Sequence, residues 1–217
     1  MRKEQRNKRV KKESIFRKTL WYHLQNNMKE YLLVFIIFAI GIVLGVIFIN
    51  KMGEEQKQEV TTYLQDFITK IKTGTTIDTT MLFKQSIQKN IVLGIVLWFV
   101  GSTVIGIPFV YLTILSRGFC LGYTISAAIA VLKMGKGLLF FFSSTFLQNI
   151  LFIPCIIAIA VSGLKFYRAV VKEKESIKQE MKRHTIFSCF CLILLILASF
   201  IETYVSTNLL MAVAKYL

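Results

Sequence analysis

Two long stretches of the chain contain no charged residue. One covers the 27 residues between Lys89 and Arg117, and the other covers the 28 residues between Lys136 and Lys165. Uncharged, mainly apolar stretches of more than about 18 residues are typical of segments that cross a lipid bilayer. A lipid-exposed segment must satisfy its backbone polar groups internally, which favours helices. The pattern therefore predicts an all-α, polytopic membrane protein.

The distribution of charge supports the same class. Only 18% of the 217 residues are charged, whereas a water-soluble domain carries about 25%. The net charge of +15 is compatible with nucleic-acid binding. However, ten Lys and Arg precede residue 31, seven lie between Lys165 and Arg183, and both groups flank apolar stretches. This is the positive-inside pattern, so we expect the lipid bilayer, and no nucleic acid, as a partner.

The apolar stretches predict five transmembrane helices, with the N-terminus in the cytoplasm and the C-terminus outside. The predicted segments are a basic cytoplasmic N-terminus at 1–30, transmembrane helix 1 at 31–50, an outer loop with amphipathic helices at 51–90, transmembrane helices 2 to 4 at 91–164, a basic cytoplasmic loop at 165–185, and transmembrane helix 5 with a short outer tail at 186–217.

The third span is the shortest of the five. We place the second span within 90–116 and the third at 118–132, with Arg117 between them. Fifteen residues form about 22 Å of helix, which is short for a full crossing, so a re-entrant hairpin is the alternative. If the segment crosses, 18 Lys and Arg lie in the cytoplasm and nine lie outside. This asymmetry favours crossing.

The outer loop contains an apolar stripe on one face of a predicted extracytoplasmic amphipathic helix. Its spacing of i, i+3, i+4, i+7, i+8 and i+11 is helical, and its members are Val60, Tyr63, Leu64, Phe67, Ile68 and Ile71. The stripe either packs onto the outer ends of the spans or the lipid interface, or binds a partner protein. A second helix is predicted to begin at Asp78, as its cap, and to continue into the next span.

Small residues predict close packing between the transmembrane helices. Gly41 and Gly45 form a G-x-x-x-G pair in the first span. In the third span, small residues recur at every fourth position, at Gly118, Gly122, Ser126 and Ala130. Such residues let helix backbones approach in lipid, where apolar burial does not drive association.

Residues for intramembrane catalysis are sparse. Both Asp residues, Asp66 and Asp78, lie in the outer loop, and the two His residues, His23 and His184, lie next to the membrane, where we expect them to be solvated. The four Cys residues lie within apolar stretches. We therefore predict that the protein is not an enzyme and has no catalytic residue, metal site or cofactor.

Three polar residues within the predicted spans are candidates for function. Gln148 and Asn149 lie in the fourth span, and Glu202 lies about 16 residues into the last one. The two amides are suited to hydrogen bonds between helices. Glu202 is either a carboxylate near the outer boundary or a buried polar anchor. An ion pathway normally needs a chain of ionisable groups, which one Glu does not supply.

Three segments, in this order, resemble the stage II sporulation protein M family. The family's "N…G…G-x-P…NG-x-x-x-G" core resembles Asn90, Gly101, Gly106, Pro108 and the run 115–122. Its "P-Q-N…P" helix resembles residues 147–154, and its "A-x-x-I-E-x" terminal span resembles residues 198–205. Three positions depart from the pattern: Leu147 replaces Pro, Arg117 replaces Asn, and Phe152 replaces an acid of broader relatives.

The resemblance implies a role that composition does not reveal. It implies a multi-pass scaffold in the sporulation septum and the engulfing mother-cell membrane, required for forespore engulfment. Its expected partners are the peptidoglycan-degrading stage II sporulation proteins D and P, which it would recruit or anchor. The alternative from the residues alone is a channel or transporter subunit, with Gln148, Asn149 and Glu202 in the pathway.

Overall fold

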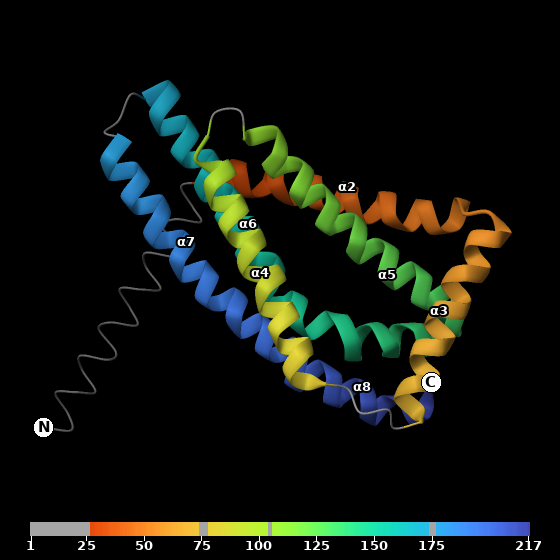
Figure 1. Cartoon of the computed structure of the whole chain (residues 1–217). Helices are drawn as coiled ribbons and strands as arrows, with labels where there is room; N and C mark the ends of the chain where they lie inside the picture. Colours follow the sequence, from red (N-terminus) through yellow and green to blue (C-terminus); the bar gives the residue numbers. More distant parts are fainter. Residues whose placement is uncertain (1–26, 74–77, 104–105, 174–176) are drawn as a thin grey trace, which may run out of the picture.

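The computed structural model describes residues 27–73, 78–103, 106–173 and 177–217 (Figure 1). Most of the predicted basic N-terminus lies outside these residues. The described residues form α2 (Met28–Lys51), α3 (Glu54–Lys72), α4 (Thr79–Gly101), α5 (Ile107–Phe141), α6 (Leu147–Arg168), α7 (Ile177–Phe200) and α8 (Thr207–Val213), the π-helical segments η1 (Phe142–Phe146), η2 (Ala169–Glu173) and η3 (Ile201–Ser206), and the 3-10 turn η4 (Ala214–Tyr216). The predicted all-α class is confirmed.

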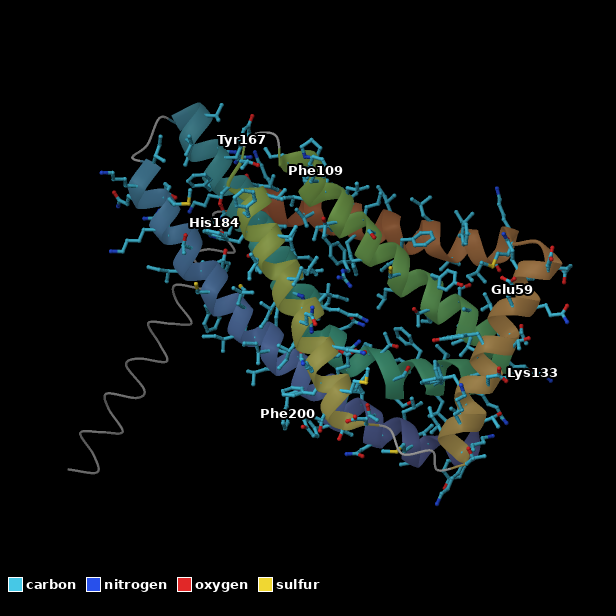
Figure 2. The ribbon with its side chains drawn as sticks, in the orientation of Figure 1. Glu59, Phe109, Lys133, Tyr167, His184 and Phe200 are labelled. Carbon is cyan, nitrogen blue, oxygen red and sulfur yellow. The ribbon has the colours of Figure 1, made fainter. Side chains whose placement is uncertain are left out.

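The long helices run back and forth between two ends of the molecule (Figure 1). One end holds the start of α2, the end of α4, the start of α5, the end of α6 and the start of α7. Helix α3, the turn after the first part of α5, and the C-terminus lie at the other end, which we call the α3 end (Figures 1 and 2).

Three helical stretches are long and apolar enough to cross a membrane: 28–51, 107–171 and 177–216. The second of these reverses direction at Lys133, whose φ of 66° lies in the left-handed region and interrupts the helix. Helix α4 is not among the three, because its first half, which contains Lys84 and Lys89, is polar. The count of five spans therefore stays a prediction.

The boundary that we predicted at Arg117 is wrong. Helix α4 ends at Gly101, and α5 begins at Ile107 with Pro108 in its first turn. Proline starts a helix at no cost there, because its missing N–H would have no helical partner. Arg117 thus lies inside a continuous helix, and residues 118–132 form only its second part.

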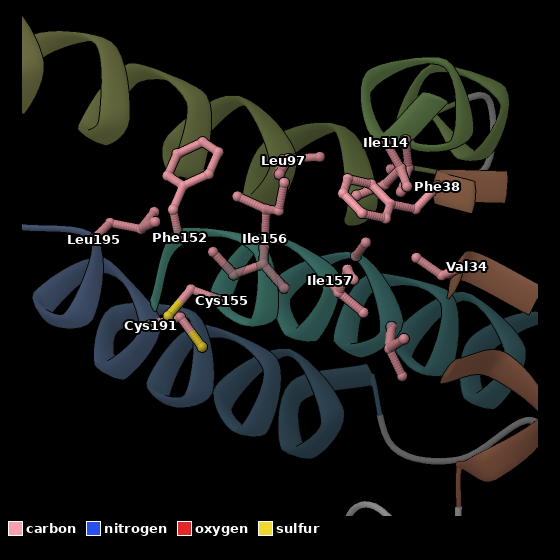
Figure 3. Packing of buried hydrophobic residues seen from close by; sticks show 14 of the residues in the cluster. Val34, Phe38, Leu97, Ile114, Phe152, Cys155, Ile156, Ile157, Cys191 and Leu195 are labelled. Atoms are coloured by element: carbon pink, nitrogen blue, oxygen red, sulfur yellow. The ribbon is translucent and has the colours of Figure 1, made fainter. Parts of the chain in front are cut away.

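The main core lies around α6, where it meets α4, α7 and α2 (Figure 3). Leu97 of α4, Ile156 of α6 and Leu195 of α7 are each at most 1% exposed. At the end opposite α3, a carboxylate and a guanidinium pair across helices, between Glu30 of α2 and Arg168 of α6. This ion pair joins the start of α2 to the end of α6.

Helices α2 and α5 pack with their backbones in contact. A Cβ atom added at Gly118 would overlap the carbonyl oxygen of Phe38, and one added at Gly122 would overlap that of Ile42. From the other side, a Cβ at Gly45 would lie 2.6 Å from the backbone nitrogen of Tyr123. The glycines of both helices thus form the contact surface.

Helix α3 packs across the α3 end. Leu64 and Ile68 are buried in a second apolar cluster with Ile49, Ala127, Ala128, Phe140, Leu210 and Leu217. The following helix begins as predicted, since the Asp78 carboxylate accepts hydrogen bonds from the backbone N–H groups of Thr80 and Met81, both at 3.0 Å. The cap satisfies two donors that the helix leaves unpaired.

Candidate functional site

A polar cavity of about 260 Å³ lies between α4, α5, α6 and the end of α7. It contains all three polar residues that the sequence singled out within the predicted spans. Its lining residues are Ser86, Lys89, Asn90, Arg117, Cys120, Leu121, Thr124, Thr145, Gln148, Asn149, Phe152, Ile153, Ala198 and Glu202. A cavity of this size lined by amides and charges is unusual in an otherwise apolar helix bundle, so it is the first candidate for a functional site.

Glu202 is the centre of a hydrogen-bond network in the polar cavity. The hydroxyl of Ser86 donates to its Oε2 atom. With its amide turned as these surroundings require, Gln148 donates from Nε2 to both carboxylate oxygens, at 3.0 and 3.2 Å. Nearby, Asn90 donates to the hydroxyl of Ser199 at 2.8 Å. Polar side chains thus link α4, α6 and the α7–η3 helix.

Gln148 and Asn149 differ in what they bind. Gln148 reaches Glu202 on another helix, whereas Asn149 donates from Nδ2 to the carbonyl oxygen of Thr145, one turn earlier, at 2.8 Å. The two adjacent amides therefore divide between an interhelical and an intrahelical hydrogen bond, although both line the polar cavity.

Two π-helical segments border the polar cavity. Segment η1 includes Thr145, and η3 includes Glu202. A π-helical turn inserts an extra residue into an α-helix and shifts the side chains that follow it, and such turns often occur at functional sites. Here the two shifts place the Thr145 and Glu202 side chains in the same cavity.

Two cations complete the polar cavity, and the sequence reasoning did not select them. The Arg117 guanidinium lies 5.2 Å from the centre of the Phe152 ring, in a cation–π contact. Lys89 lines the same cavity from α4 and is exposed. Within the part of the chain that the structure describes, neither side chain forms an ion pair. The signal that would have found Arg117 is its position as one charge between two apolar stretches.

A second, apolar cavity of about 500 Å³ lies between α3, α5 and η1. Its lining residues are Glu59, Val60, Tyr63, Leu64, Phe67, Tyr123, Thr124, Ala127, Phe140, Ser144 and Thr145. Two of these, Thr124 and Thr145, also line the polar cavity, so the two cavities adjoin.

The apolar stripe is divided between buried and exposed positions. Leu64 and Ile68 are buried, and Val60 and Ile71 pack partly buried against the same cluster. Tyr63 is 75% exposed. The sixth member, Phe67, packs one edge against the ring of Phe140, with the two ring centres 6.3 Å apart. One side of the stripe thus faces the protein, whereas Tyr63 is largely exposed at the edge of the apolar cavity that it also lines.

His184 is not solvated, contrary to our expectation. It is 2% exposed and lies between helices (Figure 2). Its Nδ1 atom is 2.8 Å from the Ser162 hydroxyl, its Nε2 atom is 3.3 Å from the carbonyl oxygen of Trp98, and its ring stacks on that of Phe166. These contacts join α4, α6 and α7 at the end opposite α3, so the residue is a packing element of the bundle.

The other candidate ligands remain dispersed. Among the residues that the structure describes, no three His, Cys, Asp or Glu side chains lie together as a metal-binding group. The four Cys residues are unpaired: Cys155 and Cys191 are buried, and Cys120 and Cys189 are exposed.

The family model of stage II sporulation protein M matches residues 34–207, from α2 to the start of α8. The chain belongs to the stage II sporulation protein M family. Members are sporulation proteins of the membrane, and no catalytic activity is known for the family. The match includes α3 and every residue of the polar cavity. No curated protein and no solved structure gives a significant match.

Proposed function

We propose that the protein is a membrane scaffold for forespore engulfment, and that it holds peptidoglycan-degrading partners at the sporulation septum and the engulfing membrane. Family membership supports a sporulation role in the membrane. The partners that the family resemblance implies are stage II sporulation proteins D and P. The scaffold role means that the chain positions these enzymes and does not itself cut the wall.

The placement of α3 is the observation that carries this proposal. Helix α3 covers one end of the bundle, while the basic segment between Lys165 and Arg183 begins at the other end (Figure 1). The positive-inside rule assigns the basic end to the cytoplasm, which leaves α3 facing the cell wall. Its outward residues include Tyr63, Glu59 and Asp66. An exposed aromatic residue among charges is a suitable anchor for a protein partner.

Replacement of Tyr63 by Glu tests the docking of partners on α3. The side chain is 75% exposed and lies at the edge of the apolar cavity, so the substitution changes the surface and that edge but leaves the buried Leu64 and Ile68 in place. We expect recovery of the two hydrolases with the detergent-solubilised protein to fall at least about tenfold, as for loss of an interface anchor. The measurement is co-purification from sporulating cells.

Tyr216→Glu is the matched control. It is the same substitution at a tyrosine that is 73% exposed and lies at the same end of the molecule, outside α3. Recovery of the hydrolases should be unchanged with this variant. Equal recovery with Tyr63→Glu and with the unaltered protein would refute docking on this face of α3.

A channel or transporter subunit is the second candidate function, and the polar cavity is the observation that favours it. Glu202 is the one carboxylate that lines this cavity within the described residues. If the cavity is part of an ion pathway, Glu202→Gln should abolish a proton- or cation-dependent flux in liposomes that the unaltered protein supports. If the protein is only a scaffold, neither the unaltered protein nor Glu202→Gln should give a flux. A flux above that of empty liposomes would therefore show that the protein is more than a scaffold.

A further inference from the structure

We infer that the polar and apolar cavities together bind one molecule of an anionic phospholipid. Its phosphodiester would lie beside Arg117, and one hydrocarbon chain would extend beneath α3. This goes beyond the proposed scaffold role, because it concerns a ligand within the bundle and not a protein on its surface.

The charge of the polar cavity is the first argument. Its lining includes two cations, Lys89 and Arg117, and one carboxylate, Glu202, so it carries one net positive charge. The carboxylate is bound by neutral donors, Ser86 and Gln148. A cation without a counter-ion among apolar helices is costly, and such residues normally face a partner or a ligand. A phosphodiester carries the single negative charge that balances this lining.

The chemistry of Arg117 is the second argument. A guanidinium presents several N–H donors in one plane, which match the oxygens of a phosphate group. The guanidinium carbon lies 5.2 Å from the centre of the Phe152 ring, and among the described residues no carboxylate forms an ion pair with Arg117. The geometry therefore suits an oxyanion better than a neutral ligand.

The adjoining apolar cavity is the third argument. It shares Thr124 and Thr145 with the polar cavity, so an anionic head and an attached chain can occupy both at once. Its volume of about 500 Å³ is within the range of about 300–1,000 Å³ for ligand sites. Apolar side chains from two helices line it, among them Leu64 and Phe67 of α3 and Ala127 of α5. A free anion would leave this cavity unused.

The test compares lipids of equal chain length on the full-length protein in detergent, by native mass spectrometry. We expect phosphatidylglycerol to bind at least about tenfold more tightly than phosphatidylcholine, a difference of about 1.4 kcal/mol. Both lipids offer a phosphodiester to Arg117, but the choline cation of phosphatidylcholine adds a positive charge beside a lining that is already positive. Glycerol phosphate at equal concentration should not displace the bound lipid. Equal binding of the two lipids, or displacement by glycerol phosphate, overturns the inference.

Two variants locate the site. Arg117→Gln should remove the preference for phosphatidylglycerol, whereas Lys70→Gln, at an exposed lysine of α3 outside both cavities, should keep it. Ala127→Leu narrows the apolar cavity and leaves every charge in place, so it should weaken both lipids alike. Each variant is first shown to be monodisperse and to melt like the unaltered protein. If Arg117→Gln keeps the preference while folded, the phosphate is not bound there.

Discussion

At the scale of single residues, the contact between α2 and α5 depends on side chains that are absent. A Cβ atom at Gly122 would overlap the backbone of Ile42, whereas one at Gly135, after the turn, would meet nothing within 4 Å. Backbone atoms cannot move aside as a flexible side chain can, so an added methyl group must separate the helices.

Gly122→Ala should therefore destabilise the protein by about 2 kcal/mol, the cost of overpacking a tight contact. In a helix, alanine is favoured over glycine by about 1 kcal/mol, so the clash must outweigh that gain. Gly135→Ala is the control and should leave the melting temperature in detergent unchanged or raise it. A Gly122→Ala protein that melts at or above the unaltered one would contradict the contact.

Single residues also show where sequence reasoning stops. The spacing of Gly118 and Gly122 is enough to indicate a packing face, because small residues at every fourth position have few other uses in a span. Arg117 and His184 were misplaced for a different reason. A hydropathy pattern places charged residues and histidines at the ends of membrane spans. In the structure, the Arg117 guanidinium packs against the Phe152 ring. The His184 imidazole forms hydrogen bonds with the Ser162 hydroxyl and the Trp98 carbonyl oxygen. Those partners are far away in the sequence.

At the scale of elements, α3 is held mainly by the buried side of its apolar stripe. It packs against α5 and the C-terminal η4 turn, with Leu64 and Ile68 buried at the contact. The helical spacing predicted the stripe, but it did not predict which of the six residues are buried. Together they cover a wider part of the helix surface than the neighbouring helices can bury.

Leu64→Asp should release α3 without unfolding the remainder of the bundle, because the main core around α6 contains no residue of α3. Burying a carboxylate without a partner costs more than the packing of one helix can supply. Amide hydrogen exchange, read by mass spectrometry, should rise across 54–72 and stay unchanged in α6 and α7. Tyr63→Asp, on the exposed side of the same helix, should leave exchange in α3 as it is. Protection of α3 in Leu64→Asp would show that other contacts hold it.

At the scale of the whole molecule, the polar cavity is assembled by pairs that are far apart in the chain. Ser86 and Glu202 are separated by 116 positions, and Asn90 and Ser199 by 109. The sequence marked Gln148, Asn149 and Glu202 as unusual within apolar stretches, but no local pattern states that Gln148 and Glu202 meet. The helical class follows from periodicity and charge, whereas a site between helices depends on how the helices pack.

The number of crossings depends on α4. Between α3 and α7 the chain forms α4, and then an antiparallel pair that reverses at Lys133. The pair begins and ends at the same end of the molecule, so it does not change which side the following residues occupy. Helix α4 alone changes the side, and its apolar part, from Ile91 to Gly101, has eleven residues, about 17 Å of helix. Its first half lines the polar cavity with Ser86 and Lys89 instead of facing lipid.

We therefore expect α4 to cross, with its polar half facing the cavity, and positions 63 and 178 to lie on opposite sides of the membrane. Tyr63 and Lys178 are both exposed, so a cysteine at either should react without disturbing the fold. In intact protoplasts, a membrane-impermeant maleimide should label Tyr63→Cys, and it should label Lys178→Cys only after lysis. The unaltered protein is the control for labelling of its own four cysteines. Labelling of both positions in intact protoplasts would show that α4 does not cross, and the basic segment would then lie on the wall side with α3.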